Sequence, residues 1–145
     1  MNKRRAPAQD VMWSLLEAAG AVEGRIEAAL AEVGLSGAKL AALTQLVEAA
    51  EPITLGELAA QCACVRSNIT QLVDRLEADR LVRRVDDPAD RRSLRAQITP
   101  LGRERQALGA KKIEAVRKQL AGALKAIDGD ALQRALAGLD PVSKK

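Results

Sequence analysis

The side chains best suited to nucleophilic or redox chemistry in this chain are those of Cys62 and Cys64, its two cysteines. A thiol near the start of a helix can have a lowered pKa and react as a thiolate. The chain has no histidine, however, and so lacks the commonest general base and a common zinc ligand. Two thiols are also too few for a closed metal site. Because free cysteines are commonly buried, we expect Cys62 and Cys64 to pack in the interior, with oxidant sensing as the alternative.

A second group of residues is polar and lies on one predicted helix directly after the cysteines. Ile69, Leu72, Val73 and Leu76 recur at three- and four-residue steps, which predicts the buried side of that helix. The opposite side starts with hydrogen-bond donors and acceptors of the kind that contact base edges in the major groove. These residues are Arg66, Ser67, Asn68, Thr70 and Gln71, with Arg75 one turn further on and within reach of a phosphate. Taken alone, such a surface is also typical of an ordinary solvated helix.

A charged hairpin is predicted after that helix. Leu81–Val85 and Leu94–Ile98 have the apolar pattern of short strands, and the polar residues 86–92 form the turn between them. Arg91 and Arg92 lie at the tip, where positive side chains suit a narrow minor groove or its phosphates. Asp90 is placed to hold the Arg92 guanidinium in a bidentate ion pair. Next to two helices joined by a short turn, this hairpin favours the interpretation as a DNA-binding wing.

The remaining elements are helices whose ends carry capping signals. Thr54 and Glu57 form a capping-box pattern at the start of a short helix that ends near Cys62. Asp128-Gly129-Asp130 interrupts the last helical region. The other predicted helices are Ala8–Val33, a second one capped by Ser36 and running from Gly37 to about Glu48, a long one opened by Thr99-Pro100, and a short one from Ala131 to Leu139.

Composition narrows the class of partner. The chain has 145 residues, 48% of them hydrophobic, which is enough for one core, and its net charge is +4. Trp13 is its one aromatic residue, so stacking of single-stranded bases is excluded as a binding mode and a nucleic-acid partner should be duplex. No apolar run approaches the length of a membrane span, and no secretory signal follows the basic start. We expect a cytoplasmic protein without a membrane partner.

The stretch from Ile53 to Gly102 resembles the winged helix-turn-helix of the multiple antibiotic resistance regulator (MarR) family. The similarity lies in TLGELA, in NITQLVDRLEADRLVRR, and in the wing DPADRR followed by ITPLG. The resemblance implies a dimer whose terminal helices interdigitate, with recognition helices in successive major grooves and wing arginines in minor grooves. It also implies repression that is relieved by a small molecule or an oxidant.

By position, Arg66, Ser67, Asn68, Thr70 and Gln71 match the start of the family's recognition helix. Asp90 and Arg92 match the aspartate-x-arginine pair of its wing. The sequence departs from the family at Arg80, where glycine usually ends the recognition helix at a site that favours positive φ. It also departs at Val65, in place of a capping Ser or Thr, and at Cys62 and Cys64, in place of aliphatic residues.

These observations predict a mainly α fold with a small β-hairpin wing. Residues 1–145 form a single domain, with a winged helix-turn-helix DNA-binding region at 36–99 and dimerisation helices at 8–35 and 100–139. The predicted function is that of a homodimeric transcriptional repressor that binds a pseudo-palindromic duplex operator and is released by an unknown small-molecule effector. We expect no catalytic residue, cofactor or metal. The alternatives are a winged-helix module that binds another protein, and a redox-sensing regulator that uses Cys62 and Cys64.

Overall fold

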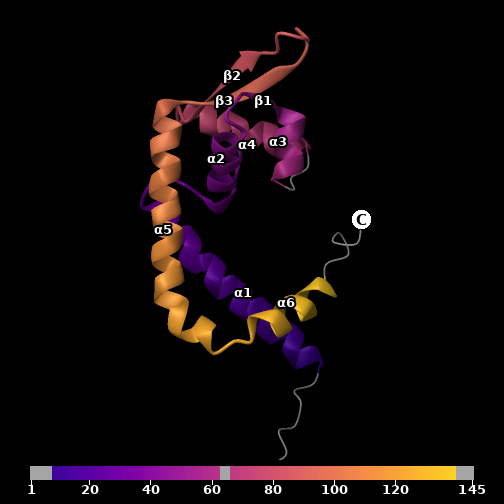
Figure 1. Cartoon of the computed structure of the whole chain (residues 1–145), viewed down its shortest axis with the longest axis vertical. Helices are drawn as coiled ribbons and strands as arrows, with labels where there is room; N and C mark the ends of the chain where they lie inside the picture. Colours follow the sequence, from indigo (N-terminus) through magenta and orange to yellow (C-terminus); the bar gives the residue numbers. More distant parts are fainter. Residues whose placement is uncertain (1–7, 63–65, 140–145) are drawn as a thin grey trace, which may run out of the picture.

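The structure is a computed structural model that describes residues 8–62 and 66–139 of the chain. It is mainly α-helical with a small sheet, as predicted (Figure 1). Its elements in chain order are α1 (Ala8–Ala31), α2 (Gly37–Ala49), β1 (Ile53–Thr54), α3 (Leu55–Gln61), α4 (Arg66–Ala78), β2 (Val82–Asp86), β3 (Leu94–Ile98), α5 (Pro100–Lys125) and α6 (Gly129–Ala137).

The hairpin is part of an antiparallel sheet with the strand order β1-β3-β2. Strand β3 has the predicted bounds, whereas β2 begins and ends one residue later than predicted. Strand β1 was not predicted at all, because two residues show no alternation. It forms where Ile53 pairs with Ala96 and Thr54 pairs with Arg95, a contact set by the fold rather than by the local sequence.

The predicted capping signals start the helices. Ser36 accepts a hydrogen bond from the Lys39 amide at the start of α2, and Thr99 accepts one from the Gly102 amide at the start of α5. Thr54 and Glu57 form both hydrogen bonds of the capping box on α3. The break before the last helix is also present, but α6 begins at Gly129 and is capped by Asp128, two residues earlier than predicted.

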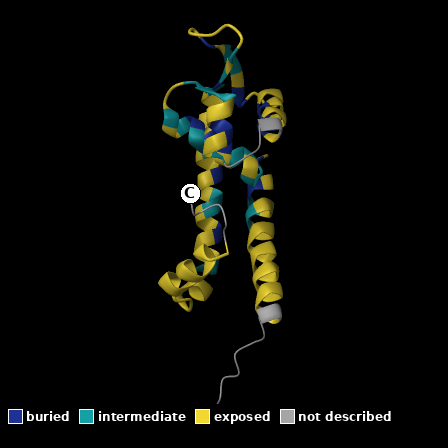
Figure 2. Cartoon of the chain, turned by 90° about the vertical axis from the view of Figure 1, so that its right-hand side faces the viewer, coloured by how far each residue is buried: buried dark blue, intermediate teal, exposed yellow. Residues whose placement is uncertain are grey.

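The core lies at one end of the molecule, between α2, α3, α4 and the sheet (Figure 2). The four apolar residues predicted for the inner side of α4 are all buried there, and Leu30 brings the end of α1 into the same cluster. Helix α5 runs from the sheet to the far end of the molecule, where α1 and α6 lie (Figure 1). No helix within residues 8–62 and 66–139 is long and apolar enough to span a membrane.

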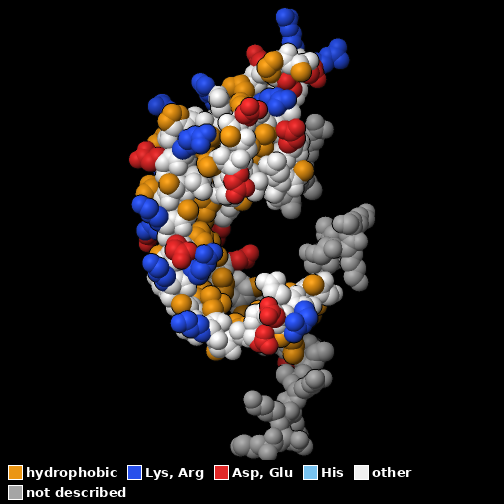
Figure 3. Space-filling model, viewed as in Figure 1, with side chains coloured by type: hydrophobic (Ala, Val, Ile, Leu, Met, Phe, Trp, Pro, Cys, Tyr) orange, Lys and Arg blue, Asp and Glu red, His pale blue; other side chains and the backbone are white. Residues whose placement is uncertain are grey.

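Away from the core, α1 and α6 expose much apolar surface. Trp13 and Leu16 are each 55% exposed, and Leu139, just beyond α6, is 64% exposed. Figure 3 shows that the molecule curves around an open hollow between its winged-helix end and the end that carries α1 and α6. A single chain therefore leaves this surface uncovered.

Candidate nucleic-acid interface

Helix α4 carries the polar residues that were predicted to contact bases. Asn68, Thr70, Gln71 and Arg75 are exposed, and Ile69 is fully buried beneath them. Because a helix turns by about 100° per residue, Thr70 and Gln71 lie on the outer surface, opposite the buried side. Arg66 and Ser67 belong to the first turn of α4, but their side chains lie outside the described part of the structure, as does Val65.

The polar side of α4 borders two hollows. Asn68, Gln71 and Arg75 line a shallow one of about 230 Å³ beside the start of α2. Thr70 lines the other, of about 470 Å³, together with Asp90 and Arg92 of the wing. The structure thus brings Thr70 and the two wing residues to one place, whereas Asn68 and Arg75 lie toward α2.

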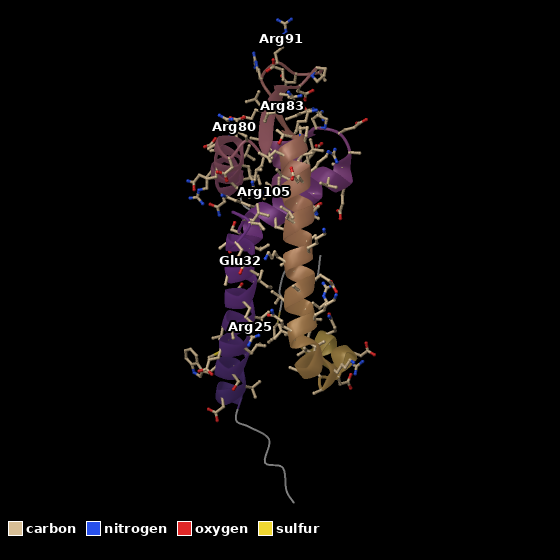
Figure 4. All side chains as sticks on the ribbon, turned by 90° about the vertical axis from the view of Figure 1, so that its left-hand side faces the viewer. Arg25, Glu32, Arg80, Arg83, Arg91 and Arg105 are labelled. Atoms are coloured by element: carbon tan, nitrogen blue, oxygen red, sulfur yellow. The ribbon has the colours of Figure 1, made fainter. Side chains whose placement is uncertain are left out.

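The wing extends beyond the core, with Arg91 near its tip (Figure 4). Arg91 and Arg92 are exposed. The expected ion pair between Asp90 and Arg92 is not formed, and this prediction was wrong. Instead, Asp90 Oδ1 accepts a hydrogen bond from the Arg92 backbone amide at 3.0 Å, which closes the turn. The Arg92 guanidinium makes no ion pair with any described residue, so it remains available to a phosphate.

A half-buried arginine that sequence reasoning missed holds the base of the wing. Arg95 Nε lies 3.3 Å from Asp87 Oδ1, and Arg95 Nη1 donates to the Pro52 carbonyl at 3.1 Å. Asp87 is buried although it is charged. The Ala89 amide, which donates to the Asp87 carboxylate, and then Arg95 hold the pKa of Asp87 below its ordinary value, although burial acts in the opposite direction.

Asp87→Asn should therefore destabilise the protein at neutral pH but not in acid. A carboxyl whose pKa is lower in the folded state stabilises that state above its unfolded pKa of about 3.9, and this contribution is lost as the pH falls through the folded pKa. Urea unfolding of the parent and of Asp87→Asn should thus differ at pH 7 and converge well below pH 4. A constant difference across that range would show that Asp87 acts only by packing.

Arg80 and Cys62 lie on either side of α4, at positions where the sequence departs from the MarR family pattern. Arg80 follows α4 with φ 61°, so the position that favours glycine is occupied by an arginine in the left-handed region. Cys62, at the end of α3, is half-buried and packs against the core cluster. Cys64 lies outside the described residues, and its role stays a prediction.

Known proteins resemble this chain in sequence. The sequence model of the MarR family matches residues 33–93. The uncharacterized HTH-type transcriptional regulator YsmB of Bacillus subtilis is 32% identical over 93 residues, which are 64% of this chain and 63% of YsmB. The aligned part therefore spans slightly less than two thirds of that relative.

Two solved structures match over more of the chain. Sco3205, a MarR family regulator of Streptomyces coelicolor in complex with DNA, is 27% identical with a TM-score of 0.75, over 97% of this chain and 94% of its own. CouR of Rhodococcus jostii, bound to p-coumaroyl-CoA, is 27% identical with a TM-score of 0.73, over 93% and 92%. With the winged helix described above, these matches show that the chain has the fold of MarR family regulators and is similar to them over most of its length.

Proposed function

We propose that this protein is a cytoplasmic, sequence-specific transcriptional regulator that binds duplex DNA as a homodimer and is not an enzyme. The observation that carries the proposal is the joint exposure of Thr70 and Gln71 on α4 and of Arg91 and Arg92 on the wing. The first pair offers hydrogen bonds to base edges, and the second offers positive charge to a minor groove or its phosphates. Sco3205 was solved in complex with DNA, which supports the same role here.

The dimer is proposed on the apolar surface of α1 and α6. Soluble monomers rarely expose a contiguous apolar patch of that kind, and a second copy of the chain would cover it. A twofold dimer would present two α4 helices to a pseudo-palindromic operator. By this account, residues 36–99 contact DNA, and residues 8–35 and 100–139 form the dimer.

We further propose repression that is relieved by a small molecule. CouR was solved with p-coumaroyl-CoA bound, which supports the binding of a small-molecule effector by this fold. A winged-helix module for a protein partner is the competing function. Unlike DNA binding, it requires neither a base preference nor a steep dependence of affinity on salt concentration.

Selection of bound duplexes from a random pool tests the proposal, followed by affinity measurements on the selected duplex across a salt series. Arg92→Ala should weaken binding to all duplexes and reduce the salt dependence, because it removes a phosphate contact. Gln71→Ala should change the base preference at one position per half-site by about 1–3 kcal/mol. No selected duplex, or equal small losses for both variants, would contradict the proposed DNA surface.

A further inference from the structure

Arg84, in the middle of β2, joins the wing to α4. It lies on the same side of β2 as the buried Val82, because side chains alternate along a strand. Its Nη2 lies 2.5 Å from Asp74 Oδ1, and its Nη1 lies 3.1 Å from Glu77 Oε1. The Arg84 backbone amide donates to the other Glu77 oxygen at 2.9 Å. A fourth contact, at 3.5 Å, runs from Nη2 to the Thr70 carbonyl.

These contacts run along α4 from Thr70 to Glu77 and overlap the part of the helix that the proposed function assigns to DNA. Thr70 and Asp74 lie one turn apart, and Glu77 lies almost one turn further on. One guanidinium therefore contacts three turns of α4 from a strand whose hairpin carries Arg91 and Arg92. Its side chain is only 18% exposed, so its position is restricted by its surroundings.

The two acidic partners also have an electrostatic consequence. Asp74 and Glu77 are 61% and 43% exposed, on a helix that is proposed to approach a polyanion. Left unpaired, both carboxylates would repel phosphates. Ion pairs with such exposed partners add little to folding stability. The Arg84 contacts should therefore act mainly by fixing the positions of α4 and the wing relative to each other.

We propose that Arg84 is a positioning residue that holds α4 and the wing at a defined spacing, so that Gln71 and Arg92 reach their DNA contacts together. This inference rests on the proposed DNA-binding function and deepens it. By this account, Arg84 contributes to sequence selectivity without touching a base. Without these contacts, the wing and α4 would no longer be held at the spacing that the operator requires. The affinity for the specific duplex would then fall more than the affinity for a non-specific duplex.

The first test compares Arg84→Met with Arg83→Met. Both variants remove one positive charge from β2, but Arg83 is exposed on the other side of the strand, where its Nε donates to Gln97 Oε1 at 2.7 Å. The measurement is the ratio of affinity for the selected duplex to affinity for a random duplex, at constant salt. We expect Arg84→Met to lower this ratio by about tenfold, comparable to one mismatched base pair. Arg83→Met should leave the ratio unchanged.

The second test separates positioning from charge. Asp74→Asn combined with Glu77→Gln removes two negative charges near the DNA, so electrostatics alone predicts tighter binding to both duplexes and an unchanged ratio. The positioning role predicts that the ratio falls by about tenfold despite the added positive charge. The ratio for Arg84→Lys should lie between those of the parent and of Arg84→Met, because lysine keeps the charge but lacks the forked geometry of the guanidinium.

The outcomes for the two proposals are distinguishable. A parent protein that selects no duplex would refute the proposed function itself. A parent that selects a duplex, with a ratio that is unchanged in Arg84→Met or in the double variant, would refute only the role of Arg84. If Arg84→Met fails to fold by circular dichroism, the double variant and Arg84→Lys decide the question.

Discussion

Gly102→Ala is expected to destabilise the fold by about 3 kcal/mol, which corresponds to a fall in Tm of roughly 10 °C. A Cβ at this position would lie 2.1 Å from the Leu81 carbonyl oxygen and 2.7 Å from Ile98 Cγ1. The Leu81 oxygen cannot move freely, because it also accepts a hydrogen bond from the Thr99 amide at 3.0 Å. The first turn of α5 would therefore have to shift away from the α4–β2 junction.

Gly56→Ala is the matched control for this prediction. Gly56 lies in α3, away from the proposed dimer surface, and the nearest atom to an added Cβ is Thr54 Oγ1 at 4.0 Å. This change should be neutral or stabilise the protein by up to about 1 kcal/mol, because alanine restricts the unfolded chain. Thermal unfolding of both variants by circular dichroism makes the comparison. Equal stability of Gly102→Ala and the parent would show that α5 does not rest on the Leu81 backbone.

Local signals in the sequence were sufficient to predict where three of the helices begin. Ser36, Thr54 and Thr99 each start a helix because a side-chain oxygen two or three residues ahead of an exposed amide is a short-range interaction. The inner side of α4 was equally predictable, since its apolar residues follow the helical period. Contacts of this kind depend on neighbours along the chain and little on the rest of the fold.

The ion pairs that arrange the candidate site could not be predicted in the same way. Arg84 bonds to residues seven and ten positions away, and Arg95 bonds to a carbonyl 43 positions away. Alternation along β2 does place Arg84 on the same side as Val82, and this was the one available signal for an inward arginine. The predicted partner of Asp90 was wrong, because its carboxylate accepts a hydrogen bond from the Arg92 backbone amide in its own turn and forms no ion pair with the Arg92 guanidinium.

The apolar surface of α1 leads to the second prediction with a large effect. The described core begins at Ile26 and Leu30, so the earlier part of α1 does not contribute to it. Leu15 lies in that earlier part and is 37% exposed. In a monomer, a charge there would change stability by no more than about 0.5 kcal/mol. In a twofold dimer, the same substitution would bury a charge in both subunits, which costs several kcal/mol for each ion.

Leu15→Asp should therefore convert the protein from a dimer of twice 15.4 kDa to a folded monomer at micromolar concentration. Its affinity for the selected duplex should fall by roughly a hundredfold, because the two half-sites would no longer be bound together. Leu94→Asp is the control, since Leu94 is similarly exposed, at 41%, but lies on β3, outside the two segments that are proposed to form the dimer. Light scattering with circular dichroism should show Leu94→Asp as a dimer and both variants as folded. A parent that is monomeric, or a Leu15→Asp variant that stays dimeric, would remove α1 from the proposed interface.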